Sequence, residues 1–151
     1  MGKNAIESSL NFLNGRGIQY ATVLLTENIL RHSIFDANKQ IRELLKSTGL
    51  HDFGTQQKGV EHKVYVSTHI LTFMRDIPSQ TSLYKAGTRG DNRMWFGSKV
   101  FEVSKPDSVF AIFVYNCELY IINITTIDIN ACFTSSLKNP IKDFLNKILQ
   151  N

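Results

Sequence analysis

The side chains best suited to chemistry lie in residues 82–97, which read SLYKAGTRGDNRMWFG. Lys85, Arg89 and Arg93 follow one another at four-residue intervals, with glycines, hydroxyls, amides and aromatic rings between them. Such spacing would place the cations on one face of a helix, but two glycines and the run TRGDN disfavour a helix. We therefore predict an exposed loop that leads into a short strand at residues 93–96. This composition suits a groove lined by phosphates and base edges, although a solvated hairpin would have the same composition.

A second polar segment, residues 52–63, has the same character as residues 82–97. It contains glycine, long amides and cations, and it precedes a predicted strand. Glutamine and asparagine can pair with adenine through two hydrogen bonds, and arginine and lysine can bind guanine or phosphate. Two such segments leaving one sheet could straddle a DNA duplex. The alternative is that both are ordinary solvated connections.

The residues of a metal-dependent nuclease are only partly present. That chemistry needs a Pro-Asp pair and then an acid-x-Lys on the next strand, so that two carboxylates hold the metal. A Pro-Asp pair ends at Asp107, but the acid Glu118 is followed two positions later by Tyr120 instead of lysine. The chain also lacks a GxxxxGK[ST] phosphate loop, and neither cysteine has a neighbouring base to activate it. We expect no metal and no cofactor; a small nuclease built on Asp107 and Glu118 is the enzymatic alternative.

The bulk composition fits one ordinary folded domain. The chain has 151 residues, of which 42% are hydrophobic and 20% are charged. A net charge of +4 permits a polyanionic partner but does not require one. The two cysteines have neither zinc-site nor disulfide-framework spacing, which is typical of a reducing compartment. The longest apolar run, residues 109–124, is interrupted by polar side chains, and no secretory signal is present, so we expect a cytoplasmic protein without a membrane partner.

Apolar periodicity predicts three helices. The first spans residues 4–13 and ends near Gly15. The second spans residues 37–48, with Asp36 as its N-cap and a C-terminal glycine after it. The third begins at Pro140 after a capping asparagine and carries an apolar stripe to the end of the chain.

The remaining apolar segments are typical of strands. Val60, Val64 and Val66 indicate a strand at residues 60–66, and residues 109–114 and 119–124 form a strong hairpin signal around an Asn-Cys pair. Residues 18–25 fit either a strand or a helix. Consecutive strands without alternating helices favour an antiparallel sheet or barrel with helices packed outside.

The order of these features over residues 41–125 resembles the DNA-binding domains of bacterial restriction enzymes. These domains have the B3-like pseudobarrel fold, which is also found in plant B3 transcription factors. The resemblance rests on HDFGTQQKG and a strand, then SLYKAGTRGDNRMWFG, then a hydrophobic hairpin containing LYIINI. It is nearest to the N-terminal domain of LlaJI-type restriction enzyme subunits. It implies an α+β, mainly β fold, a seven-stranded open pseudobarrel with two helices outside; it does not place the helix at residues 4–13.

The resemblance also implies a function: site-specific binding of double-stranded DNA by two arms in the major groove. The N-terminal arm would supply Gln56, Gln57, Lys58, His62 and Lys63. The C-terminal arm would supply Ser82, Tyr84, Lys85, Thr88, Arg89, Asn92 and Arg93. Trp95 and Phe96 would pack beneath the second arm. Residues 1–151 would form a single non-catalytic domain in the N-terminal part of a longer subunit, with the motor further along the same polypeptide and cleavage performed by a partner subunit.

Three functions thus stay open. The first is a duplex-DNA reader, with RNA binding by an OB-like barrel as a variant. The second is the small nuclease. The third is a protein-interaction module that uses exposed Tyr84 and Trp95.

Overall fold

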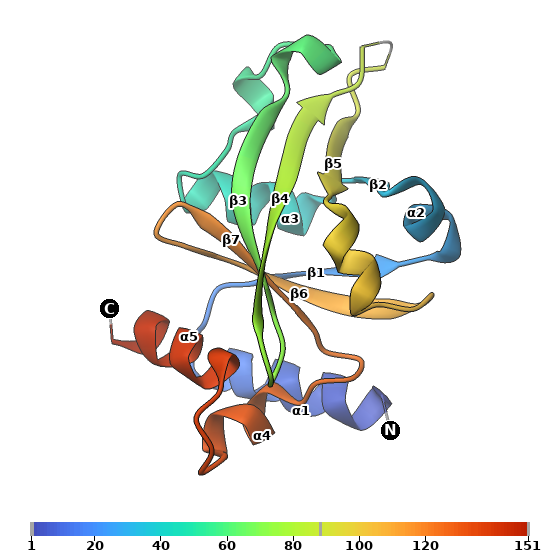
Figure 1. Cartoon of the computed structure of the whole chain (residues 1–151). Coiled ribbons are helices and arrows are strands. Elements are labelled where there is room, and N and C mark those ends of the chain that lie inside the picture. The colour runs from blue at the N-terminus through green and yellow to red at the C-terminus, as the bar shows by residue number, and fades with distance from the viewer. Residues whose placement is uncertain (1, 88, 151) are drawn as a thin grey trace.

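The computed structural model describes residues 2–87 and 89–150 (Figure 1). Across these residues one mixed sheet in the order β1-β6-β7-β3-β4-β5-β2 curls into an open half-barrel, and five α-helices surround it. The strands are β1 (Ala21–Leu25), β2 (Ile34–Asp36), β3 (Val64–Leu71), β4 (Asp76–Lys85), β5 (Asn92–Phe96), β6 (Ser108–Tyr115) and β7 (Glu118–Asn123). The helices are α1 (Gly2–Gly15), α2 (Glu27–His32), α3 (Lys39–Ser47), α4 (Ile129–Thr134) and α5 (Pro140–Leu149). The predicted α+β, mainly β open pseudobarrel is confirmed, with more helices than the two that the resemblance implied.

The β6–β7 hairpin is the centre of the sheet, and it was predicted correctly. Asn116 and Cys117 form its two-residue turn with φ angles of 52° and 64°. Positive φ at both turn positions matches the twist of paired strands. β7 then pairs with β3 in a parallel arrangement, whereas every other strand pair among the described residues is antiparallel.

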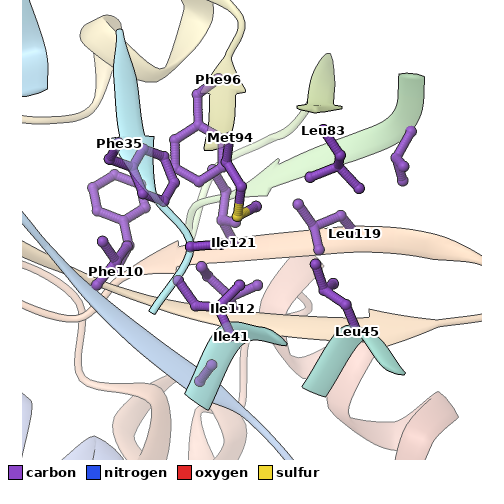
Figure 2. Packing of buried hydrophobic residues seen from close by; sticks show 14 of the residues in the cluster. Phe35, Ile41, Leu45, Leu83, Met94, Phe96, Phe110, Ile112, Leu119 and Ile121 are labelled. Carbon is purple, nitrogen blue, oxygen red and sulfur yellow. The ribbon is translucent and has the colours of Figure 1, made fainter. Parts of the chain in front are cut away.

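Both faces of β6 and β7 are buried, which explains their nearly continuous apolar sequences. The inner face supplies Phe110, Ile112, Leu119 and Ile121 to the core inside the half-barrel, where they meet α3 and strands β2, β4 and β5 (Figure 2). The opposite face, which includes Phe113, packs against α1, α4 and α5. The hairpin therefore separates two hydrophobic cores, and three helices close the lower end of the molecule in Figure 1.

Helix α3 begins slightly later than predicted and with a different cap. The side chain of Asn38, not Asp36, accepts the backbone N–H of Ile41 at 2.8 Å. Asp36 belongs to β2 and pairs with Arg93 of β5, so its backbone cannot start the helix. The predicted C-terminal glycine, Gly49, follows the helix with a φ of 77°.

Strand β4 is the main element that the sequence prediction missed. Residues 82–85 were expected to be part of an exposed loop, but they continue β4, which pairs with the whole length of β3, from Val64 opposite Leu83 to Leu71 opposite Asp76. The predicted strand at residues 60–66 is shifted as well, because residues 60–62 form a 3₁₀ turn before β3. Residues 18–25, left open between strand and helix, contain β1.

We expect Asn139→Ala to lower the free energy of unfolding by about 2–3 kcal/mol. The Asn139 side chain accepts from the N–H of Lys142 and donates to the buried carbonyl of Cys132 at 3.0 Å, so alanine removes a helix cap and leaves that carbonyl unpaired. Urea denaturation measures the change. The control is Asn146→Ala on the exposed face of α5, which should change stability by less than about 0.5 kcal/mol; equal effects would contradict the assigned role of Asn139.

Candidate nucleic-acid interface

The two polar segments meet at one end of the molecule. Strands β3, β4 and β5 extend beyond the rest of the half-barrel, at the top of Figure 1, and carry both segments there. Lys58 and Lys85 form an isolated parallel β-bridge, and the N–H of Gly59 donates to the Lys85 carbonyl at 2.8 Å. The two predicted arms are therefore joined into one projection. We call residues 52–63, 82–87 and 89–93 the arm lobe.

Gln56 holds the arm lobe together. Its Nε2 donates to the Leu83 carbonyl of β4 at 2.9 Å and to the His62 carbonyl at 3.0 Å. Its Oε1 lies 3.0 Å from His51 Nε2, which donates to it in the matching tautomer. Every polar atom of this predicted base-reading amide is thus engaged within the protein. The structure places Gln56 as a support for the first segment.

The pleat of β4 and β5 divides the predicted C-terminal arm between two faces. Tyr84 lies opposite Arg93, and Ser82 opposite Trp95, on the outer face. Lys85 lies opposite Asn92 on the other face, which also carries the core residue Met94. Successive side chains of a strand point to opposite sides, so these residues cannot all contact one ligand surface.

The outer-face residues are largely buried or lie close to other side chains of the protein. Ser82 and Tyr84 are only 1% and 6% exposed, and Lys63 Nζ lies 5.0 Å from the centre of the Tyr84 ring. Arg93 Nη2 lies 3.4 Å from an Asp91 carboxylate oxygen. The interaction-module alternative required an exposed Tyr84 and is wrong on that point, because Lys63 covers the ring. Phe96 is buried as expected, with its ring centre 4.9 Å from that of Phe35.

Lys58 and Arg89 are the exposed lysine and arginine of the arm lobe, whereas Lys85, which also lacks a carboxylate partner among the described residues, is partly buried. No carboxylate of the described residues lies within ion-pair distance of Lys58 or Arg89. Gln57 and His62 are also exposed. A hydrogen bond of 2.8 Å from the Gly90 N–H to the Ala86 carbonyl closes the turn that carries Arg89. Thr88 lies outside the described residues.

Glycine is favoured at position 90, where the two segments touch. Gly90 has a φ of 74°, and a Cβ atom there would lie 2.9 Å from the Cε of Lys58. The Lys58 side chain therefore passes directly over the turn that carries Arg89. The sequence prediction recognised the glycines as loop formers but not this contact.

Sequence reasoning missed the exposed apolar side chains next to these cations. Val60 and Tyr65 are 61% and 58% exposed, and Val64 is exposed as well. Tyr65 could have been found from the alternation of β3, because it lies one position from buried Val66. The surface of the arm lobe is thus a mixture of cations, an amide and apolar groups.

The carboxylate pair of the nuclease alternative does not form. Asp107 precedes β6, whereas Glu118 pairs with Tyr115 at the other end of β6. At about 3.3 Å per residue, the strand separates them by roughly 25 Å. Glu118 instead lies 3.1 Å from His69 Nε2. Among the described residues, no group of three or more His, Cys, Asp or Glu side chains could hold a metal ion.

Burial lowers the pKa of His51, at the base of the arm lobe, below its usual 6.5, although the Gln56 hydrogen bond and nearby Asp52 act in the opposite direction. The ring also packs edge-on against Phe53, with 4.5 Å between ring centres. A neutral His51 is therefore part of the support of the first segment.

Comparisons of this chain with protein-family models, curated proteins and solved structures found no match. Within residues 2–87 and 89–150, no helix is long and apolar enough to cross a membrane.

We expect Gln56→Leu to lower the free energy of unfolding by about 1–3 kcal/mol, because two backbone carbonyls lose their donor. Chemical denaturation measures this change. The neighbouring exposed residue provides the matched control: Gln57→Leu should leave stability within about 0.5 kcal/mol of the parent. A Gln56→Leu variant as stable as Gln57→Leu would rule out the supporting role.

Stability should also fall with acidification because of His51. Its folded-state pKa is lowered, so near pH 6 the unfolded chain binds more protons than the folded one at this site. The contribution of His51 to the free energy of unfolding is complete when the ring is neutral. This contribution is lost as the pH falls below about 6.5. Denaturation at about pH 7.5 and about pH 5 should therefore show a larger loss for the parent than for His51→Gln. Identical losses would contradict this assignment.

Proposed function

We propose that this protein binds double-stranded DNA site-specifically and that the arm lobe enters the major groove. The observation that carries the proposal is the bridge between Lys58 and Lys85. It holds two exposed cations, Lys58 and Arg89, from separate parts of the sequence at one projecting end. Cations without carboxylate partners are available to phosphates and to guanine.

The shape of the arm lobe supports the major groove as its site. That groove is about 12 Å wide and admits a two-stranded β-ribbon. Only the end of the β4–β5 pair, closed by the turn that carries Arg89, resembles such a ribbon, because β3 pairs with β4 as far as Leu83 and β2 pairs with β5 as far as Arg93. Exposed Val60 and Tyr65 lie in or beside the lobe and offer apolar contacts for thymine methyl groups, whereas Gln57 offers an amide for adenine.

Following the resemblance, we further propose a biological role as the target-recognition domain of a restriction endonuclease. The domain itself would be non-catalytic and would need no cofactor. Its partners would be the motor and nuclease parts of the same restriction system, and it would act in the cytoplasm. The absence of cleavage by this chain alone, assayed on plasmid DNA with magnesium, is the outcome expected from this role.

We expect Arg89→Ala to weaken binding to a selected duplex by about 1–3 kcal/mol and to relax preference at one base pair, if Arg89 reads a guanine. Titrations at several salt concentrations measure this, and affinity should fall as salt rises.

The matched control is Arg75→Ala, which removes another exposed arginine at the opposite end of the β3–β4 pair. It should bind like the parent. If Arg89→Ala and Lys58→Ala both bind as tightly as Arg75→Ala, the arm lobe is not the DNA-binding surface.

A further inference from the structure

A second cationic cluster lies on the other face of the β4–β5 ribbon, beside α3. A pocket of about 350 Å³ is lined there by Lys39, Arg42 and Lys46 of α3, together with Lys85 and Asn92 of the ribbon. None of the three α3 residues was singled out from the sequence. The pocket joins the α3 surface to the arm lobe, because Lys85 belongs to both.

The position of α3 explains why its cations face this pocket. Lys39, Arg42 and Lys46 are spaced i, i+3 and i+7, which places them along one side of a helix. Ile41 and Leu45 are fully buried on its other side against the inner core, as Figure 2 shows. Burial of that apolar face fixes the rotation of α3 and directs the basic side toward the ribbon.

The pocket has an excess of positive charge. Four cations line it against two carboxylates, Glu43 and Asp52. Lys39 Nζ lies 3.9 Å from Glu43 Oε1. Both side chains are strongly exposed, so this ion pair is weak. Asp52 Oδ1 accepts the N–H of Gly54 at 2.8 Å.

The cations of the pocket differ in whether contacts within the protein hold their side chains. Arg42 Nη1 donates to the Ala37 carbonyl at 2.7 Å, which positions the guanidinium and leaves its other donors available. Neither Lys46 nor Lys85 lies within 4.0 Å of a carboxylate among the residues that the structure describes. A convergent set of lysines and one pre-positioned arginine is suited to a phosphate group.

We propose that this pocket binds a backbone phosphate of the duplex whose major groove the arm lobe occupies. The assignment to DNA rests on the proposed function, whereas the affinity for phosphate rests on the pocket alone. The α3 cations would fix the orientation of the protein on the duplex without reading sequence. They would therefore contribute equally to binding of specific and non-specific duplexes.

The test compares the salt dependence of duplex binding in three variants of the whole chain. Lys39→Gln/Lys46→Gln keeps helix propensity while removing two cations. It should reduce the slope of log K against log salt by about 0.9 for each lost phosphate contact, and weaken binding on the order of tenfold per contact at about 0.1 M salt. Glu43→Gln should act oppositely and tighten binding. Lys105→Gln/Lys138→Gln, at exposed positions that do not line this pocket, is the matched control and should leave the slope unchanged.

A second experiment separates the two claims. The protein is titrated with pyrophosphate, and the NMR chemical shifts of its backbone amides are measured. Pyrophosphate should shift the amides of α3 in the parent and not in Lys39→Gln/Lys46→Gln. If the parent binds duplex but the α3 variant keeps the parent slope, this inference is overturned and the proposed function stands. If the parent binds no duplex, the proposed function and the DNA assignment both fall, even when pyrophosphate shifts α3. Absence of any pyrophosphate shift would overturn the phosphate pocket itself.

Discussion

The cross-connection between residues 52–63 and the end of β4 is the constraint on which the candidate interface depends. The Gly59 N–H donates to the Lys85 carbonyl, and Gln56 donates to the Leu83 carbonyl 27 residues away. Phe53 anchors the start of the first segment in the inner core, and these backbone-directed hydrogen bonds then fix where its remaining, polar residues lie. Without them, residues 52–63 would not be held against the ends of β4 and β5. With them, Lys58 and Arg89 belong to one surface.

The pleat of the β4–β5 ribbon then distributes chemistry between two sides. The outer side carries Tyr84, whose ring lies against Lys63, and Arg93, which pairs with Asp91. The inner side carries Lys85 and faces α3. A ribbon seated in a major groove would present its turn to the bases and one flank to a backbone. This division would provide the proposed reading tip and the proposed phosphate pocket within one small domain.

The β6–β7 hairpin and helices α1, α3 and α5 were predictable from local sequence signals, whereas the short helices α2 and α4 and strand β4 were not predicted. The Asn116-Cys117 turn and the Asn139-Pro140 start of α5 each carry a local sequence signal for their structure. β4 does not, because Pro78 and the polar residues after it read as a loop. Pro78 is tolerated because β5 pairs only with residues 81–85, so its missing N–H removes no β4–β5 hydrogen bond. The basic character of the candidate site was visible, but its division into faces followed from the unpredicted register of β4.

The most direct measurement of the central claim is selection of bound duplexes from a random pool, with single-stranded RNA of the same length as competitor. Site-specific duplex binding predicts enrichment of one short consensus that RNA does not displace, and a complex that weakens as salt rises. A pool that stays random after repeated selection, or one that RNA displaces completely, would contradict site-specific recognition of duplex DNA by the arm lobe.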